Sequence, residues 1–182
     1  MPAGPMFPPV TVAAIDIGTN TVLLLVARVA SDGLVVPLVY EQRIPRLGRG
    51  VDAARRLAAD SMERVVSTLE EYQLLIRGHA PDAIAVFGTS AVRDASNRDA
   101  LASLITRRTG YRLEVLSGAE EALLTYRGAI SGIRGIAGAT VVDIGGGSTE
   151  ITSGAAGEIL GSASLDIGSV RLTERFFRRD PP

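Results

Sequence analysis

Two short glycine-containing turns carry acidic and hydroxyl side chains at matching positions, 127 residues apart along the chain. In each turn an aspartate, Asp16 or Asp143, ends an apolar run and is followed by Ile-Gly and small hydroxyl residues. Glycine lets the backbone approach a ligand closely, and consecutive N–H groups in a tight turn form a concave site for phosphate oxygens. A single turn favours a plain hairpin with a solvated aspartate, whereas two matched copies favour a pair of phosphate-binding loops. The predicted phosphate-binding residues of the two turns are Gly18, Thr19, Asn20, Thr21, Gly145, Gly146, Gly147, Ser148 and Thr149.

The acidic residues of these turns are candidate metal ligands. Asp16 and Asp143 could hold a hydrated Mg²⁺, because this ion prefers one or two carboxylates together with phosphate oxygens. Glu150 follows the second turn on the next predicted strand, where it could assist the metal or position a water; the alternative is an exposed strand residue. The candidate cofactor is Mg²⁺, with a monovalent cation such as K⁺ as a further candidate.

A pair of glutamates stands at the expected start of a helix. Ser117 and Glu120 have the spacing of a capping box, which gives Glu120 a structural role at the helix N-terminus. Glu121 has no such role, and a carboxylate facing a phosphate site can orient and deprotonate a water. Glu121 is therefore the candidate catalytic base, although an ordinary surface glutamate is the alternative for this residue taken alone.

Arginines supply the only abundant positive charge. Arg93 follows a buried-type strand, at the edge where α/β sheets bind ligands, and could clamp phosphate; an ion pair with Asp94 or Asp99 is the alternative. A second group lies in a Gly- and Arg-rich loop, where it could guide a polyanion or simply be solvated. This group consists of Arg43, Arg46 and Arg49.

Composition excludes several kinds of chemistry. All 19 basic residues are arginine and cysteine is absent, which excludes Schiff bases, a P-loop lysine, thiolate nucleophiles and disulfides. The single histidine, His79, is most simply a charge at a helix C-terminus. The net charge of −1 predicts no nucleic-acid or membrane partner. The chain shows neither a cationic leader nor a membrane-spanning run, so we expect a cytoplasmic protein.

The elements that must position these residues follow from apolar periodicity. An antiparallel three-stranded start is expected, followed by strands that alternate with helices, which implies an α/β layer with parallel pairing. Strands are predicted at 10–16, 21–29, 34–44, 82–87, 112–116, 140–144 and 150–153. Helices are predicted at about 57–78, 97–110, 117–131 and 170–178.

The return of the opening pattern after residue 139 indicates two similar domains, because the repeat is as long as a domain. We expect a flexible N-terminus at 1–9, a first domain at 10–135 and the N-terminal part of a second domain at 136–182. A third Asp-Ile-Gly, at 166–168, is taken as a chance echo.

The motifs together resemble the exopolyphosphatase/guanosine pentaphosphate phosphohydrolase (Ppx/GppA) family of the actin–sugar kinase–Hsp70 superfamily. Five blocks in order carry the resemblance and span nearly the whole chain. They are Ala14–Thr21, Gly88–Ala95, Ser117–Ala122, Val142–Glu150 and Asp166–Phe176.

The resemblance implies two ribonuclease-H-like domains, each a mixed sheet with flanking helices, whose phosphate loops face each other across a cleft. It implies Glu121 as the general base, Asp143 and Glu150 as residues that hold Mg²⁺, and Arg93 as a phosphate contact. The implied reaction releases orthophosphate from inorganic polyphosphate or removes the 5′-phosphate of guanosine pentaphosphate. A homodimer is also expected, since dimers occur in the family.

Two alternatives remain open. An actin-fold kinase or ATPase shares the paired turns but lacks the Ser-Gly-x-Glu-Glu-Ala block. Family members are longer than 182 residues, so a truncated, non-catalytic polyphosphate-binding remnant is the other alternative. Such a remnant would bind anions through Arg46, Arg49 and Arg93.

Overall fold

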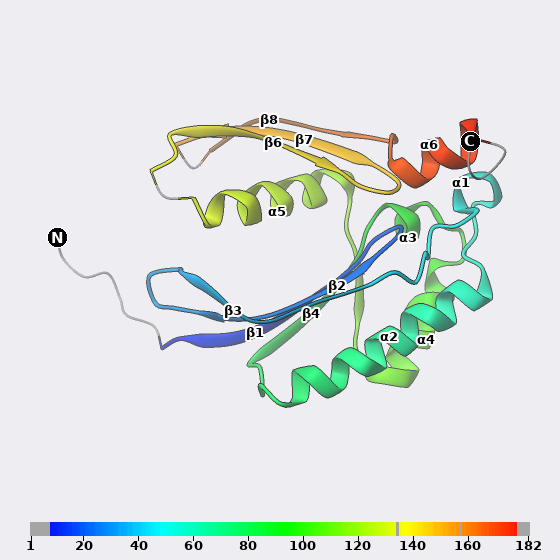
Figure 1. Cartoon of the computed structure of the whole chain (residues 1–182), viewed down its shortest axis with the longest axis horizontal. Helices are drawn as coiled ribbons and strands as arrows, with labels where there is room; N and C mark the ends of the chain where they lie inside the picture. The colour runs from blue at the N-terminus through cyan, green and yellow to red at the C-terminus, as the bar shows by residue number, and fades with distance from the viewer. Residues whose placement is uncertain (1–7, 134, 157, 178–182) are drawn as a thin grey trace.

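The computed structural model describes residues 8–133, 135–156 and 158–177. Most of the predicted flexible N-terminus, residues 1–7, lies outside the described residues, as do residues 178–182, which include the end of the last predicted helix. The described chain folds into two sheets with helices between and beside them (Figure 1).

The first sheet has five strands in the order β3-β2-β1-β4-β5. Its first three strands in the chain, β1, β2 and β3, pair antiparallel, whereas β1 pairs parallel with β4 and β4 pairs parallel with β5. This mixed pairing confirms the predicted antiparallel start followed by a parallel layer. The strand bounds are β1 Val10–Ile17, β2 Val22–Val29, β3 Val35–Arg43, β4 Ala83–Gly88 and β5 Leu113–Val115.

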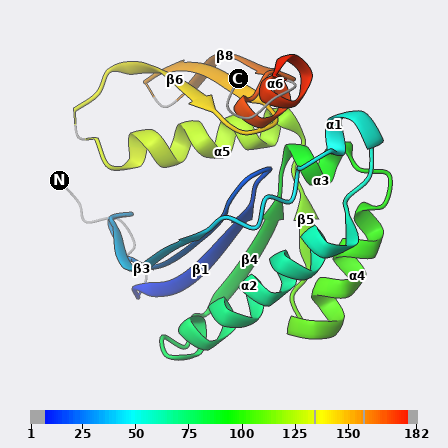
Figure 2. The same ribbon diagram turned by 45° about the vertical axis from the view of Figure 1, so that its right-hand side comes forward.

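Helices α2 (Ala59–Arg77) and α4 (Arg98–Thr109) cover one face of this sheet (Figure 2). Their apolar residues recur at helical spacing and pack on alternate residues of β1 and β2, which forms the main core of the molecule. The fully buried members include Ile15, Ile17, Leu24, Val65, Leu69, Tyr72, Leu101 and Ile105.

Two short helices were not predicted. α1 (Val51–Ala54) lies in the region between β3 and α2, and α3 (Ser90–Asp94) follows β4 directly, where the sequence indicated a loop. Helices of four and five residues are too short to show a 3.6-residue period. Asn97 stands at the start of α4 without capping it, because its side chain bonds both backbone groups of Leu57.

The second sheet is an antiparallel meander of β6 (Gly138–Ile144), β7 (Thr149–Ala155) and β8 (Glu158–Leu165). Helix α5 (Gly118–Ser131) packs on one face of this second sheet, and helix α6 (Ser169–Phe176) follows β8 in the chain.

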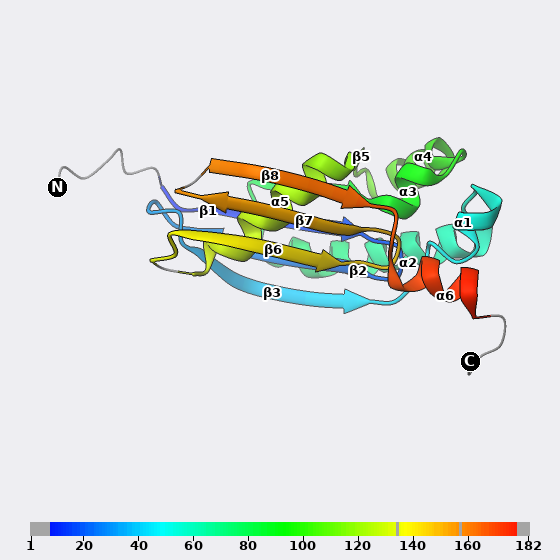
Figure 3. The same ribbon diagram turned by 90° about the horizontal axis from the view of Figure 1, so that it is seen from above.

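Seen from above, the second sheet lies over α5 and the first sheet (Figure 3). In space α5 belongs with the second sheet, although it precedes residue 135 in the sequence. The domain limits themselves stay a prediction.

Candidate active site

Parallel pairing brings three segments to one edge of the first sheet. Ile17 is paired with Gly88, and Gly88 with Val115, so that β1, β4 and β5 end together. The backbone N–H of Thr89 donates to Ile17 O at 3.2 Å, and that of Leu116 donates to Gly88 O at 3.0 Å. The first turn (residues 16–21), α3 and the start of α5 therefore lie side by side at the edge where α/β sheets bind ligands.

The first turn and the second turn (residues 143–149) have the same backbone geometry. The N–H of Gly18 donates to Thr21 O at 2.9 Å, and that of Gly145 donates to Ser148 O at 3.0 Å. Within the described part of the chain, the next three N–H groups of each turn, in 19–21 and 146–148, donate to no protein acceptor. Unpaired consecutive N–H groups are what a phosphate-binding turn offers.

The two turns also touch each other. A Cβ atom placed on Gly147 would lie 2.7 Å from Thr19 Oγ1 and 2.5 Å from Ser90 Oγ, and one on Gly146 would lie 3.0 Å from Thr19 Cβ. These glycines are thus needed for the contact between the turns, whatever they bind.

The side chains predicted to bind phosphate divide into two groups. Thr19 is only 7% exposed and its hydroxyl pairs with that of Ser90 at 2.8 Å, while Thr149 Oγ1 donates to Ile167 O. These two hydroxyls are engaged inside the protein. Asn20 and Thr21 are half-buried at the first turn, and Ser148 is buried in the second.

Glu121 lies near the N-terminus of helix α5, and its role differs from that of the neighbouring Glu120. Glu120 and Ser117 form the predicted capping box. The Glu121 carboxylate is 14% exposed and accepts a hydrogen bond from Arg93 Nη1 at 3.0 Å. The pKa of Glu121 is raised to about 7, mainly by burial of the carboxyl. The negative charges of Glu150 and Asp16 add to this effect, and together they outweigh the opposing effect of Arg93. A carboxyl with this pKa can act as a base near neutral pH.

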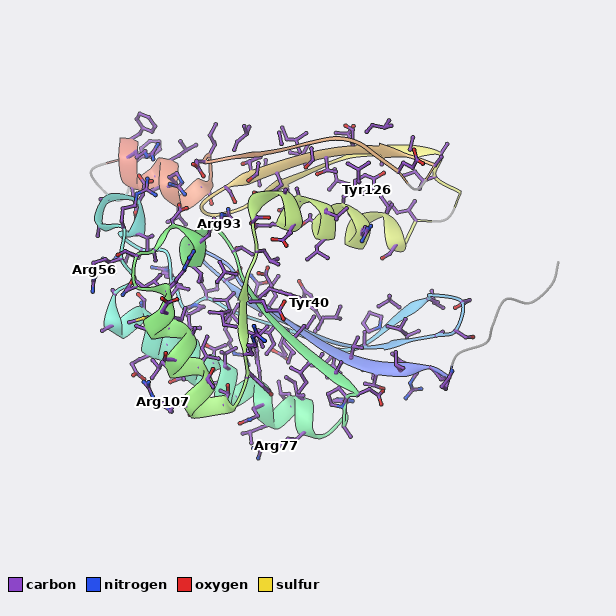
Figure 4. All side chains as sticks on the ribbon, turned by 180° about the vertical axis from the view of Figure 1, so that it is seen from behind. Tyr40, Arg56, Arg77, Arg93, Arg107 and Tyr126 are labelled. Atoms are coloured by element: carbon purple, nitrogen blue, oxygen red, sulfur yellow. The ribbon has the colours of Figure 1, made fainter. Side chains whose placement is uncertain are left out.

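Arg93 makes a contact that neither sequence interpretation anticipated. Its partners are Glu121 and the carbonyl of Leu116, at 2.9 Å, so the ion pair is with the candidate base and not with Asp94 or Asp99. Figure 4 shows Arg93 where α3 meets the start of α5, far from Arg77 and Arg107.

Asp16 is half-buried at the start of the first turn. Its Oδ1 atom is the one buried side-chain oxygen in the described residues without a hydrogen-bond partner. Burial, reinforced by the nearby charge of Asp143, raises the pKa of Asp16 to about 6. On the opposite sheet, Asp143 Oδ2 accepts a long hydrogen bond from Thr125, at 3.4 Å. Carboxylates from the two sheets therefore face each other.

Glu150 is buried, at 2% exposure, so the alternative of an exposed strand residue is wrong. It pairs across the hairpin with Asp143, and its Oε1 accepts a hydrogen bond from Ser164 at 2.8 Å. Ser164 lies on β8, where nothing in the sequence pointed to it.

The acidic residues fit a magnesium ion that binds together with phosphate. No group of three or more acidic or histidine side chains in the described ranges is close enough to hold a metal by itself. The unpartnered oxygen of Asp16 and the neighbouring Asp143 supply two carboxylates, the number that Mg²⁺ uses when phosphate and water complete its shell.

The remaining candidates lie around this centre. Arg43 pairs with Glu41 and Glu71, whereas Arg46 and Arg49 are exposed on the segment bonded to the first turn through the N–H of Arg46 and Asn20 O. The third Asp-Ile-Gly, at residues 166–168, does not form a third turn of this kind. A Cβ on Gly168 would lie 2.4 Å from the backbone of Gly146, so this glycine supports the second turn.

Comparison with known proteins gives a consistent result. Residues 25–182 match the model of the Ppx/GppA phosphatase family. Exopolyphosphatase 2 of Mycobacterium tuberculosis is 45% identical over 181 aligned residues, which cover 94% of this chain and 56% of that protein. The crystal structure of an exopolyphosphatase-like protein superposes with a TM-score of 0.91 at 41% identity, over 97% of this chain and 56% of that one. The chain thus spans about half the length of the relatives that it matches.

A more distant likeness concerns the fold alone. Ethanolamine utilization protein EutJ from Carboxydothermus hydrogenoformans matches with a TM-score of 0.54 at 17% identity, over 94% of this chain and 57% of that one. The predicted fold class, an actin-like α/β arrangement with a mixed sheet and flanking helices, is confirmed. Among the described helices, none combines the length and the apolar character that crossing a membrane requires.

Proposed function

The chain belongs to the Ppx/GppA phosphatase family, and on that premise we propose that it is a phosphohydrolase acting on terminal phosphates. The proposed substrates are inorganic polyphosphate and the 5′-phosphate of guanosine pentaphosphate. The observation that carries the proposal is the Glu121 carboxyl, only 14% exposed and with a pKa of about 7, near the charges of Arg93, Glu150 and Asp16. A base is most effective when its pKa lies near the working pH.

In the proposed mechanism the free N–H groups of the two turns bind the oxygens of the terminal phosphate. Glu121 accepts the proton of the attacking water, and Arg93 holds the Glu121 carboxylate in place. Asp16 and Asp143 would hold Mg²⁺, with Glu150 beside Asp143, and the ion supplies charge neutralisation on the phosphate oxygens when bound. Phosphoryl transfer depends mainly on such positioning and neutralisation, so this acidic site needs neither lysine nor cysteine.

The test is phosphate release by the 182-residue chain with Mg²⁺, from long-chain polyphosphate and from guanosine pentaphosphate. Glu121→Gln should lower kcat by about 10²- to 10⁴-fold, the usual contribution of a general base. Glu120→Gln is the matched control, because glutamine still completes the capping box and activity should persist.

Three results would change the proposal. Absence of release by the wild type contradicts hydrolysis by this chain. Polyphosphate binding without release favours a non-catalytic binding module. Release that survives Glu121→Gln removes Glu121 from the role of base.

A further inference from the structure

The guanidinium of Arg171, on α6, is buried among three separate segments. The side chain is only 6% exposed. Its Nε donates to the carbonyl of Gly147 at 2.7 Å, its Nη2 to Asp94 Oδ2 at 2.6 Å, and its Nη1 to Asp52 Oδ1. One residue therefore contacts the second turn, α3 and α1 at once.

Neighbouring contacts join the same segments. Arg175 donates to Asp52 from Nε at 2.6 Å, and the N–H of Gly50 donates to Glu174 Oε1 at 2.9 Å. At the other end of α6, the N–H groups of Val170 and Arg171 both donate to Gly146 O, at 2.9 and 3.0 Å. Figure 1 shows α6 beside α1, at the end of the molecule where the two sheets approach each other.

α3 connects this cluster to the candidate base. Within its five residues, Asp94 accepts from Arg171, Arg93 donates to Glu121, and the hydroxyl of Ser90 pairs with that of Thr19 in the first turn. A cavity of about 20 Å³ between the turns and the cluster is lined by Thr19, Asp52, Ala91, Asp94, Gly147 and Arg171, among others. A displacement of α3 would therefore move the Arg93–Glu121 contact and the contact between the turns together.

We propose that Arg171, with Asp52 and Asp94, is a latch that holds the two phosphate-binding turns and α3 in one fixed arrangement. Arg171 is a positioning residue, because it reaches the second turn through a carbonyl and the base only through α3. The consequence for catalysis rests on the proposed function, whereas the latch itself does not.

The chemistry of the cluster favours arginine over a simple charge. A guanidinium presents several donors in a fixed planar fork and so can satisfy two carboxylates and a carbonyl together, which a lysine ammonium cannot do with the same geometry. In every other ion pair among the described residues the arginine is at least 22% exposed, including Arg175, which shares Asp52 and is 47% exposed. Arg171 is thus the buried centre of the contact between the two halves.

The experiment compares wild type, Arg171→Lys, Arg171→Met and the control Arg108→Met. Arg108 also pairs with two glutamates, but it joins α4 to α2 away from both turns. Phosphate release should fall about 10-fold in Arg171→Lys and about 100-fold in Arg171→Met, the usual cost of a small misplacement of catalytic groups. The acidic limb of the pH profile of phosphate release should shift to higher pH, because a displaced Arg93 no longer opposes protonation of Glu121. Arg108→Met should change neither.

Amide hydrogen exchange tests the latch without any substrate. The N–H groups of Val170 and Arg93, which donate to Gly146 O and Thr89 O, should exchange faster in Arg171→Met, while those of β1 and α2 stay protected. Should Arg171→Met not fold, Asp94→Asn removes one charge of the latch, keeps an acceptor and should give the same pattern.

The outcomes separate the two proposals. Faster exchange at α3 and α6 in a chain that releases no phosphate retains the latch and removes the proposed function. Unchanged exchange, or equally faster exchange across the whole chain, overturns the latch even if the enzyme is active.

Discussion

The two hairpins β1–β2 and β6–β7 share a backbone plan and differ in what they carry. In both, a strand ends in Asp-Ile, a turn that begins with glycine leads to an antiparallel partner, and a third strand follows. Even the register shift recurs, between Val26 and Ala27 in the first meander and between Ser153 and Gly154 in the second, again 127 residues apart. The repeat is therefore structural and extends beyond the turn.

The acidic residues do not follow this symmetry. Leu23 stands opposite Asp16 in the first hairpin, whereas Glu150 stands opposite Asp143 in the second. The first hairpin thus supplies one carboxylate near its turn and the second supplies two. The duplicated backbone gives two similar turns, and Glu150 in place of a leucine makes the second hairpin the more acidic one.

The turns also fit each other because they differ. Gly146 and Gly147 occupy the positions that Thr19 and Asn20 occupy in the first turn, and the Thr19 side chain fills the space that the glycines leave. Identical turns could not approach so closely. The asymmetry is what allows two copies of one turn to pack directly against each other.

Removing the extra carboxylate tests this comparison most severely. Glu150→Leu gives the second hairpin the residue of the first, and we expect kcat for phosphate release to fall about 10²- to 10³-fold. Leu23→Met, which conserves volume in the first hairpin, should leave kcat within a few-fold of wild type. Equal effects of the two substitutions would show that the difference between the hairpins has no part in the chemistry.

A side chain in the second turn should separate the two turns. A Cβ at Gly147 would lie 2.5 Å from Ser90 Oγ, so Gly147→Ala should displace the turns and lower kcat about 10- to 100-fold. Gly161→Ala on β8 is the control, because nothing lies within 4 Å of its Cβ position. If Gly147→Ala retained full activity, the close contact of the turns would be unimportant.

Sequence reasoning was most successful where the signal is local. The strands around each turn, the α2 periodicity and the Ser117–Glu120 box depend on neighbours within one element, and the structure confirms them. It failed where a role depends on a distant partner. The buried Glu150 accepts a hydrogen bond from Ser164 on another strand, and Arg171 pairs with Asp52 at a separation of 119 residues. The role of Glu121 as a base stays a prediction, although its position beside Arg93 could not have been read from either motif alone.

The raised pKa of Glu121 predicts how stability depends on pH. Its folded pKa of about 7 lies above that of an unfolded glutamate, about 4.3, so the folded state binds the proton more tightly. Stability is therefore greatest below about pH 4 as far as this group is concerned, and it falls as pH rises toward 7. Glu121→Gln should raise the free energy of unfolding by about 1–3 kcal/mol at pH 8 and hardly at all at pH 4.

Urea unfolding at the two pH values measures this difference. Glu120 provides the contrast, because its hydrogen bonds to Ser117 lower its pKa and its charge stabilises the fold above that pKa. Glu120→Gln should therefore act in the opposite direction at pH 8. If the effect of Glu121→Gln on unfolding were independent of pH, the pKa of Glu121 in the folded chain would not be raised toward 7.

The smallest expected effect concerns a glycine of α5 that no contact requires. Gly128 lies inside the helix, and nothing lies within 4 Å of its Cβ position, unlike Gly118 at the helix start, where a Cβ would lie 2.6 Å from Ser164 Oγ. Gly128→Ala should stabilise the chain by about 0.5–1 kcal/mol, since alanine loses less backbone entropy in a helix. Thermal unfolding should show a rise in Tm of a few degrees with kcat unchanged.

Gly118→Ala should instead lower Tm, because the start of α5, and Glu121 with it, would be forced away from β8. Equal responses at the two positions would mean that α5 is not seated on the second sheet at its N-terminus, and the position of the candidate base would lose its explanation.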